Sequence, residues 1–333
     1  MLIDTKTGRV NIMAVKKIGI LTSGGDAPGM NAAVRAVVRS ALKKNIQVIG
    51  IERGYNGLIN GEYYDMNIRS VSDIIQRGGT VLYTARCNEF RYEEGLQKAK
   101  ATCEKLGIDG IIVMGGDGSF RGAADLSARG IPCIGIPCTI DNDIACSEYT
   151  IGYDTAMNTA VEMVDKIRDT AQSHDRCSVV EVMGRHAGYI ALNAGIACGA
   201  TYILLPEKKY DLDDIVAKMK ATQSNGKHHF IIVVAEGIGN VNEISNYIES
   251  KTGIESRSTI LGHVQRGGAP TVRDRVLASQ MGQYAVEIID SGKGNRVVGM
   301  KDNKVVDYDI REALTMTRTF EEDLYKIAHE ISF

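Results

Sequence analysis

The sequence predicts an α/β protein with mainly parallel sheets that are covered by helices on both faces. Short, almost wholly apolar runs alternate along the chain with longer segments of helical periodicity. Strands of this kind are typical of parallel sheets buried on both faces. Glycine is abundant, at 36 of 333 residues against an average share of about 7%, while proline is rare, at 5. The glycines gather in turns that follow the apolar runs, so we expect a backbone that approaches a ligand closely.

The elements follow from the pattern in order. A first strand is expected at 17–21, ended by the glycine-rich turn 22–29. A helix follows, because Val34, Val37 and Ala41 recur at helical spacing. Further strands are expected at 47–51, 110–114, 133–136, 178–183, 202–205 and 230–235, and helices at 151–171 and 272–289. The length of the chain favours two lobes, and there is no internal repeat.

Composition excludes several classes of protein. Lys and Arg number 39 and Asp and Glu 41, so net charge supports neither a nucleic-acid partner nor a membrane surface. The seven cysteines form no C-x-x-C pair and have no zinc-ligand spacing with histidine, which favours reduced thiols. The first dozen residues have no apolar core typical of a signal peptide, and no apolar run approaches the ~18 residues of a membrane helix. We therefore expect a soluble, cytoplasmic protein.

Two loops between a strand and a helix contain Gly-Gly-Asp. The first, 22–31, reads TSGGDAPGMN, and the second, 114–119, reads MGGDGS. Glycine lets backbone N–H groups face an anion at a helix N-terminus, so both loops are candidate phosphate cradles. Asp117 is well placed to hold Mg²⁺ beside phosphate oxygens. The alternatives are a tight turn for the first loop and a helix N-cap for Asp117.

Three more loops carry charged side chains. Segment 137–143, PCTIDND, places Asp141 where a carboxylate can take a proton from a hydroxyl, although it also fits a plain Asx turn. Segment 183–188, MGRHAG, offers Arg185 to stabilise a transferring phosphoryl group, or else to form a surface ion pair. Segment 261–268, LGHVQRGG, offers His263 and Arg266 as a phosphate clamp on a loop. Two further lone arginines, Arg176 and Arg257, stand in loop-like settings.

Together these loops supply phosphate cradles, a metal carboxylate, a base and cationic clamps. That set is what phosphoryl transfer requires, because positioning and electrostatics provide nearly all of its catalysis. A dehydrogenase is disfavoured because G-x-G-x-x-G is absent, and G-x-x-x-x-G-K-[ST] is absent too. A kinase of the diacylglycerol or NAD type would use the Gly-Gly-Asp-Gly loop but would leave the remaining loops without a role.

The motifs, in the same order along the chain, resemble those of bacterial 6-phosphofructokinases. The resemblance rests on 19–31, 114–119, 139–143, 183–185 and 261–268 and extends from about residue 16 to the C-terminus. It implies two three-layer, phosphofructokinase-like α/β lobes. The expected divisions are an N-terminal extension at 1–15, a nucleotide-binding lobe at 16–151 plus about 265–315, and a sugar-phosphate lobe at 152–264 plus about 316–333.

The resemblance further implies transfer of the γ-phosphoryl group of MgATP to the 1-hydroxyl of fructose 6-phosphate, the committed step of glycolysis. Asp141 would be the base, supported by Thr139, Asp143 and Arg185, and Asp117 would hold Mg²⁺. The implied ATP contacts are Gly25, Arg86, Cys87, Gly116, Asp117, Gly118 and Ser119. The implied sugar-phosphate contacts are Thr139, Asp141, Met183, Gly184, Arg185, Glu236, His263 and Arg266, joined by Arg176 and Arg257 from a neighbouring subunit of a homotetramer.

Two positions bear on the phosphoryl donor. Relatives that use pyrophosphate have Asp where this chain has Gly118 and Lys where it has Cys138. Gly118 leaves room for the α-phosphate of a nucleotide, and Cys138 supplies no cation for pyrophosphate. ATP is therefore the expected donor, and pyrophosphate the alternative.

A regulatory site for ADP and phosphoenolpyruvate is also implied by the resemblance. The residues that fall on it are Arg35, Arg39, Arg168, Gly199, Thr201, Asn225 and Lys227. Thr201 stands where Glu is general in the family, and Asn225 where a basic residue is common. We expect a retained anion site with an altered effector response. A non-catalytic sugar-phosphate or nucleotide sensor is the alternative of another class, which the presence of Asp117, Asp141 and Arg185 disfavours.

Overall fold

The computed structural model describes residues 2–3, 10–11 and 15–332. The chain divides into two compact units. Unit 1 comprises 1–139, 144–152 and 268–318, and unit 2 comprises 140–143, 153–267 and 319–333. Most of the N-terminal extension expected at 1–15 lies outside the described residues, apart from an antiparallel pair formed by β1 (Leu2–Ile3) and β2 (Val10–Asn11).

Unit 1 is built on a seven-stranded sheet in the order β13-β12-β7-β6-β3-β4-β5. Its central strands are parallel, and only the edge strands β5 and β13 run antiparallel to their neighbours. The strands are β3 (Lys17–Thr22), β4 (Gln47–Ile51), β5 (Tyr63–Met66), β6 (Gly110–Gly115), β7 (Cys133–Pro137), β12 (Arg296–Lys301) and β13 (Lys304–Asp309).

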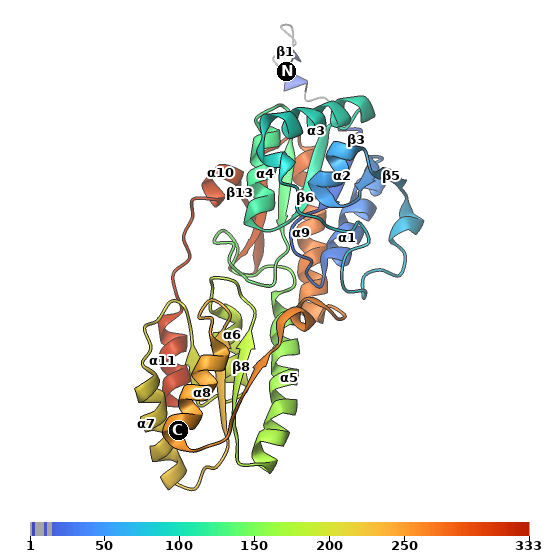
Figure 1. The fold of residues 1–333 in the computed structure, drawn as a ribbon. Coiled ribbons are helices and arrows are strands. Elements are labelled where there is room, and N and C mark those ends of the chain that lie inside the picture. The colour runs from blue at the N-terminus through green and yellow to red at the C-terminus, as the bar shows by residue number, and fades with distance from the viewer. Residues whose placement is uncertain (1, 4–9, 12–14, 333) are drawn as a thin grey trace. The chain divides into compact units, whose positions relative to one another are not determined.

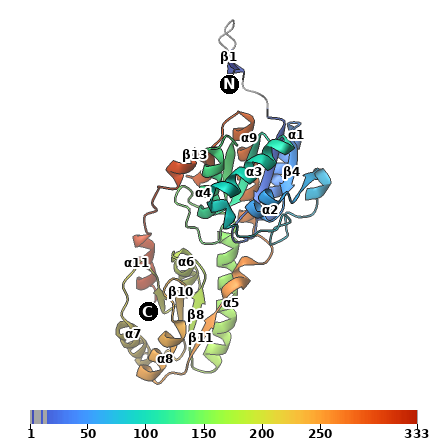
Figure 2. The same ribbon diagram turned by 45° about the horizontal axis from the view of Figure 1, so that its top comes forward.

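Helices cover both faces of this sheet (Figures 1 and 2). On one face α1 packs along α9, and on the other α2, α3, α4 and α10 enclose the larger apolar core. The helices are α1 (Met30–Lys43), α2 (Gly54–Asn60), α3 (Glu93–Leu106), α4 (Asp117–Ser127), α9 (Val272–Asp290) and α10 (Ile310–Ala313), with 3-10 turns η1 (Ile68–Val71) and η2 (Glu89–Arg91).

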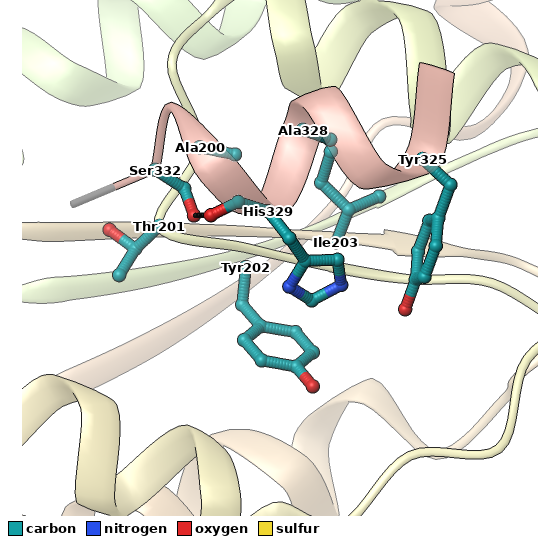
Figure 3. Close-up of a pocket in the computed structure, with 8 residues that line it drawn as sticks. All are labelled: Ala200, Thr201, Tyr202, Ile203, Tyr325, Ala328, His329 and Ser332. Carbon is teal, nitrogen blue, oxygen red and sulfur yellow. Dashed lines mark hydrogen bonds between the residues drawn. The ribbon is translucent and has the colours of Figure 1, made fainter. Parts of the chain in front are cut away.

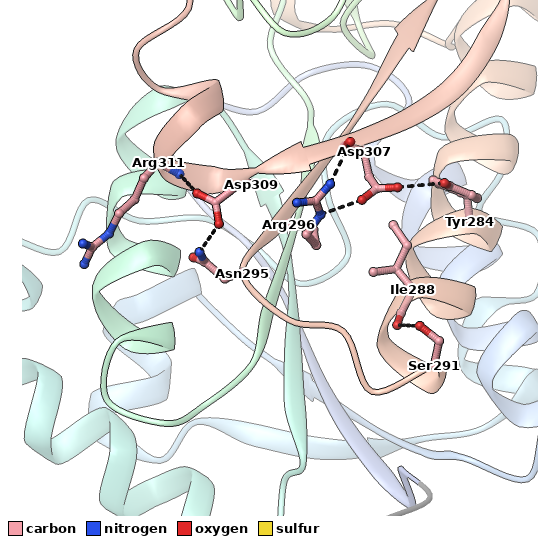
Figure 4. A network of polar contacts seen from close by, with 8 residues as sticks. All are labelled: Tyr284, Ile288, Ser291, Asn295, Arg296, Asp307, Asp309 and Arg311. Carbon is pink, nitrogen blue, oxygen red and sulfur yellow. Dashed lines mark hydrogen bonds and ion pairs between the residues drawn. The ribbon is translucent and has the colours of Figure 1, made fainter. Parts of the chain in front are cut away.

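A network of hydrogen bonds connects the hairpin β12–β13 to α9 and α10 (Figure 4). The Asp307 carboxylate accepts hydrogen bonds from Arg296 Nε at 2.5 Å and from the Tyr284 hydroxyl of α9 at 2.8 Å. Asp309 accepts from Asn295 Nδ2 at 2.6 Å and caps α10 through the backbone N–H of Arg311. These contacts belong to the framework of unit 1.

Unit 2 contains a four-stranded, wholly parallel sheet in the order β11-β8-β10-β9. Helices α5 and α6 pack on one face, with α11 against α6, while α7 and α8 enclose an apolar core on the other. Its elements are α5 (Tyr153–Ser173), β8 (Cys177–Val182), α6 (Tyr189–Ala197), β9 (Tyr202–Leu204), α7 (Leu212–Ser224), β10 (Phe230–Ala235), α8 (Val241–Thr252), β11 (Ser256–Ile260), η3 (Gly262–Arg266) and α11 (Glu322–Glu330).

The two-lobed, mainly parallel α/β architecture agrees with the expectation from sequence, and three local expectations were wrong. Arg257 lies in strand β11 and not in a loop. The segment 261–268 is not wholly loop, because 262–266 forms η3. The strand expected at 178–183 ends at Val182, which leaves Met183 just beyond it. Among the described residues, no helix is both long enough and apolar enough to cross a bilayer.

Candidate active site

The two Gly-Gly-Asp loops lie side by side in unit 1. Strands β3 and β6 are neighbours, with Thr22 opposite Met114, so the loops that follow them leave the same edge of the sheet. From β3 the chain continues to β4 on one side, and from β6 it continues to β7 on the other. This reversal makes a topological switch point, which is where open α/β sheets bind ligands.

Close backbone packing joins the two loops. The N–H of Ser23 donates to the carbonyl of Met114 at 2.9 Å, and the Ser119 hydroxyl donates to the carbonyl of Ser23 at 3.1 Å. A Cβ on Gly115 would lie 2.5 Å from the Ser23 carbonyl oxygen, so only glycine fits there. Gly24 has a φ of +89°, a conformation that favours glycine. Gly25 is exposed beside it.

Helix α4 begins in the second loop. Gly116 is its N-cap residue, and Asp117 is its first residue, not the cap. The Asp117 carboxylate is 40% exposed and forms an ion pair with Arg121 Nε at 3.0 Å. A Cβ on Gly118 would meet no atom within 4 Å, which leaves open space beside the helix start. The carbonyl of Ser119 accepts the Tyr55 hydroxyl at 2.6 Å, which fixes the first turn.

The segment that carries Arg86 and Cys87 is tied to the first loop. The Thr84 hydroxyl donates to the carbonyl of Gly24 at 2.7 Å, and the Thr22 hydroxyl donates to that of Tyr83 at 2.7 Å. Arg86 is exposed, whereas Cys87 is half-buried against the apolar core. All the nucleotide contacts expected from sequence thus belong to unit 1 and to connected loops.

The segment 139–143 leaves β7 and crosses from unit 1 to unit 2. Thr139, the residue of unit 1 just before this crossing, is 8% exposed, and its carbonyl accepts the Thr150 hydroxyl at 2.7 Å. Asn142 has a φ of +52°, which turns the chain sharply between the two aspartates. Asp141 is 7% exposed, so its carboxyl group is largely withdrawn from water.

Burial and neighbouring acids set the pKa of Asp141. Burial is the largest influence, followed by repulsion from Asp143, and together they raise the pKa from 3.8 to about 6. The guanidinium groups of Arg266 and Arg185 oppose this rise, while Glu236 adds to it. Arg185 Nη1 lies 4.0 Å from Asp143 Oδ2. These side chains, which the sequence indicated separately, therefore meet in unit 2.

Glu236 and Gln265 hold the loops of this cluster. The Glu236 carboxylate accepts the backbone N–H groups of Gly184, at 3.3 Å, and of Arg185. Gln265 is fully buried, and its amide oxygen accepts the N–H of Met183 at 2.8 Å. Gln265 was missed by sequence reasoning, although it lies between the two clamp residues of η3. Of these, Arg266 is half-buried and His263 is exposed.

Arg176 and Arg257 lie together but apart from the Asp141 cluster. Arg176 Nε binds Glu255 at 2.7 Å, and Arg257 binds the other oxygen of the same carboxylate. Both arginines stand where β8 and β11 begin, whereas the 183–185 loop follows the end of β8. Six strand residues span roughly 20 Å, so these arginines cannot join the Asp141 cluster of their own unit.

The residues expected at a regulatory site fall into two groups. In unit 1, Arg35 and Arg39 are four apart on α1 and share a face. In unit 2, Arg168 donates to the carbonyl of Cys198, and Lys227 Nζ donates to the hydroxyl of buried Thr201 at 3.4 Å. Gly199, with a φ of +58°, and exposed Asn225 lie in the same unit.

A third basic group joins Arg168 and Lys227. Burial, then Lys227 and Arg168, lower the pKa of His229, and burial, then Arg168, lower that of Lys227. Arg168, Lys227 and His229 form what we call the basic cluster of unit 2. Sequence reasoning missed His229, which follows Lys227 by two residues. Mutual repulsion of this kind favours a bound anion.

A small cavity lies near Thr201 in unit 2 (Figure 3). It is lined by Tyr202 and Ile203 and, on α11, by Tyr325 and His329. Its volume of about 10 Å³ holds at most one water molecule, so it is no pocket for a metabolite. Burial, then Lys218, lower the pKa of His329, whose ring packs edge-on against Tyr202 and Tyr325.

The seven cysteines are free thiols, and six of them are buried. Burial, followed by Asp274, raises the pKa of Cys138. At 1% exposure, the Cys138 thiol packs in the interior and does not face a ligand. Within the part of the chain that the structure describes, there is no group of three or more His, Cys, Asp or Glu side chains that could hold a metal ion.

A family model and the curated relatives compared with this chain are all described as phosphofructokinases. The family model described as phosphofructokinase matches residues 17–289. An ATP-dependent 6-phosphofructokinase from Clostridium botulinum strain Hall is 57% identical over 318 residues, which cover 96% of this chain and 100% of that protein. One from Bacillus cereus is 55% identical, with the same coverage.

Solved structures share the fold. The phosphofructokinase of Saccharomyces cerevisiae superposes with a TM-score of 0.86 at 35% identity, over 95% of this chain and 48% of that longer chain. A pyrophosphate-dependent phosphofructokinase from Marinobacter aquaeolei reaches a TM-score of 0.82 at 21% identity, over 93% of this chain and 86% of that one. At such low identity, the second likeness concerns the fold alone.

Proposed function

The chain belongs to the phosphofructokinase family, and we propose that it transfers the γ-phosphoryl group of ATP to the 1-hydroxyl of fructose 6-phosphate. The products are fructose 1,6-bisphosphate and ADP, as in the committed step of glycolysis. Relatives named as ATP-dependent 6-phosphofructokinases align with 96% of the chain. The observation that carries the proposal is Asp141, a buried carboxylate with a pKa of about 6 beside two arginines.

Asp141 takes the proton of the 1-hydroxyl as the hydroxyl oxygen attacks the γ-phosphorus. A pKa of about 6 leaves this carboxylate ionised near pH 7 yet basic enough to accept a proton, which suits a general base. Arg185 stabilises negative charge on the transferring phosphoryl group, with Thr139 and Asp143 in support. Met183, Gly184, His263 and Arg266 bind the sugar phosphate, and Glu236 also holds the 184–185 backbone.

The connected loops of unit 1 bind ATP. Gly25, in the loop before α1, and Gly116, Gly118 and Ser119, at the start of α4, provide backbone N–H groups and space, with Arg86 and Cys87 alongside. The exposed carboxylate of Asp117 fits Mg²⁺, which keeps most of its water and takes one or two carboxylates plus phosphate oxygens. When bound, this ion neutralises phosphate charge, and ion pairing with Arg121 competes for the same carboxylate.

ATP is favoured over pyrophosphate as the donor. The open space at Gly118 accommodates a nucleotide phosphate, where an Asp side chain would repel it. Buried Cys138 brings no cation towards pyrophosphate. Pyrophosphate remains the alternative donor, because a solved relative of the same fold is described as pyrophosphate-dependent.

The active site is shared between subunits of a homotetramer. Arg176 and Arg257 are assigned to the 6-phosphate of a neighbouring subunit, and their position at the opposite end of β8 from the Asp141 cluster supports this assignment. ADP or phosphoenolpyruvate binds at a site between subunits, to which we assign the basic cluster of unit 2 and the α1 pair Arg35 and Arg39. Gly199, Thr201 and Asn225 complete the site. Without a carboxylate at Thr201, its response to effectors is altered. The location that we propose is the cytoplasm, in keeping with a role in glycolysis.

The test is a coupled assay of fructose 1,6-bisphosphate formation with ATP or pyrophosphate, each with and without ADP and phosphoenolpyruvate. We expect turnover with MgATP and little with pyrophosphate, and faster turnover with pyrophosphate would reverse the donor assignment. Asp141→Ser lowers turnover by roughly 10²–10⁴-fold and leaves fructose 6-phosphate binding intact. A wild-type protein that binds both ligands without turnover would instead be a sensor.

A further inference from the structure

A buried carboxylate that the proposed reaction does not use lies at the start of α9. Asp274 is fully buried, and its backbone N–H donates to the Thr271 hydroxyl, the N-cap of the helix, at 3.3 Å. Its Oδ1 atom accepts the backbone N–H of Gly152 at 2.9 Å, across 122 positions of sequence. Burying a carboxylate is costly, so this contact needs an explanation beyond packing.

The partner of Asp274 is the end of a strap, which we define as residues 144–152. The end of the strap lies beside the segment that leads to Asp141 and runs parallel to it. Cys138 forms a parallel bridge with Ile151, whose N–H donates to the carbonyl of Pro137 at 3.0 Å. The Thr150 hydroxyl donates to the carbonyl of Thr139 at 2.7 Å. Fixing the strap therefore fixes the backbone on which Thr139 is carried.

Asp274 also borders the first Gly-Gly-Asp loop. A Cβ on Gly29, the N-cap residue of α1, would lie 3.6 Å from Asp274 Cβ and 2.6 Å from Ile151 Cγ2. A Cβ on Gly152 would lie 2.7 Å from Ala27 Cβ. Both glycines have a φ of +106°, so neither tolerates a side chain. The loop, the strap and the start of α9 are in direct contact, all within unit 1.

A second contact strengthens the same junction. The guanidinium group of Arg273, next to Asp274, stacks on the ring of Tyr149 with 3.6 Å between the Arg273 Cζ atom and the ring centroid. Tyr149 belongs to the strap. The first turn of α9 therefore binds the strap through this cation–π contact as well as through the hydrogen bond between Asp274 and Gly152. Displacing this turn would release the strap at two points.

We propose that Asp274 is a positioning residue for phosphoryl transfer, which sets the spacing between the ATP loop 24–29 and the backbone of Thr139. This inference rests on the proposed function of those two segments. Asp274 touches neither substrate, and acts by holding Gly152 and, through it, the strap. Effective transfer depends on such spacing, because a displacement of about 1 Å can reduce the rate by roughly a hundredfold.

The test compares Asp274→Ala, Asp274→Asn and wild type in the ATP assay at saturating substrates. Asp274→Ala is expected to lower kcat at least about tenfold, with the KM for fructose 6-phosphate within about twofold of wild type. Asp274→Asn keeps an oxygen that accepts from Gly152, so it should recover most of the lost kcat. Asp290→Ala is the matched control, because it removes an ion-paired carboxylate at the other end of α9 and should leave kcat unchanged.

Thr150→Val provides a second test that preserves shape and removes the hydrogen bond to the Thr139 carbonyl. It should lower kcat about threefold or more in the folded protein, and it decides the matter should Asp274→Ala not fold. If Asp274→Ala folds and its kcat lies within about twofold of the wild-type value, the proposal is overturned. If Asp274→Ala does not fold, the same result for Thr150→Val overturns it. Failure of the wild type to turn over ATP would instead refute the proposed function itself.

Discussion

Replacement of Asp141 by Asn should inactivate the protein and at the same time stabilise it. The pKa of Asp141 rises from 3.8 to about 6, chiefly through burial and then through Asp143. A rise of about 2 units corresponds to roughly 3 kcal/mol between the two protonation states. The folded state therefore binds this proton more tightly than the unfolded chain does.

The sign of the effect follows from linkage. Above about pH 6 the folded protein must hold Asp141 ionised, which reduces stability by the full amount. As pH falls from about 6 to below 3.8 the penalty disappears, because the group is then protonated in both states. Asn carries no charge at any pH, so Asp141→Asn should gain up to about 3 kcal/mol at pH 8 and only roughly 0.5 kcal/mol at pH 4.

Thermal unfolding midpoints at pH 4 to 8, measured beside turnover with MgATP, test this reasoning. Asp169→Asn is the control, since it removes an exposed carboxylate from α5 of the same unit. Asp141→Asn should lose roughly 10²–10⁴-fold in kcat. A midpoint at pH 8 that is no higher than the wild-type value, or a gain that does not change with pH, would refute the assignment of a strained, buried base.

Three further substitutions test the donor and effector assignments. Gly118→Asp should fold normally, because its Cβ enters open space, and should lower kcat/KM for ATP at least about tenfold in the coupled assay by charge repulsion. Cys138→Ala removes a buried thiol, so urea unfolding should show a free energy of unfolding lower by about 1 kcal/mol. A change of more than about twofold in the KM for ATP would contradict the interior placement of this thiol. Thr201→Glu puts a carboxylate beside Lys227. Fructose 6-phosphate saturation curves, measured with and without ADP, should then differ from those of the wild type. Variant curves identical to the wild-type curves would argue against an effector site here.

The central strands could be predicted from sequence because they are apolar along their whole length. β6 and β10 are buried at every residue, and such runs stand out without any structure. Three of the missed strands, β5, β11 and β13, lie at sheet edges and bury little, whereas β12, also missed, is an interior strand with a short buried run. β13 has no fully buried residue, and β11 has only Ser256. A strand at a sheet edge packs on part of its surface, so its sequence carries mixed polarity and no clear period.

The same distinction applies to the candidate site. Loops rich in Gly, Asp and Arg could be found from sequence because their residue types are unusual wherever they occur. The residues that hold those loops could not. Gln265 binds Met183 across 82 positions, and Asp274 binds Gly152 across 122. Neither has a local signal, because a buried amide or carboxylate is distinguished only by the backbone group that the fold brings to it.

In the proposed reaction, the electrostatics of the Asp141 cluster would make this base responsive to its own substrate. Before binding, Arg185 and Arg266 lower the pKa of Asp141 and so limit the rise caused by burial and by Asp143 and Glu236. A phosphoryl group that approaches these arginines neutralises part of their field and adds negative charge nearby. Both changes raise the pKa of Asp141 further. Its affinity for a proton therefore increases as the hydroxyl must release one, while its low exposure keeps water from supplying the proton instead.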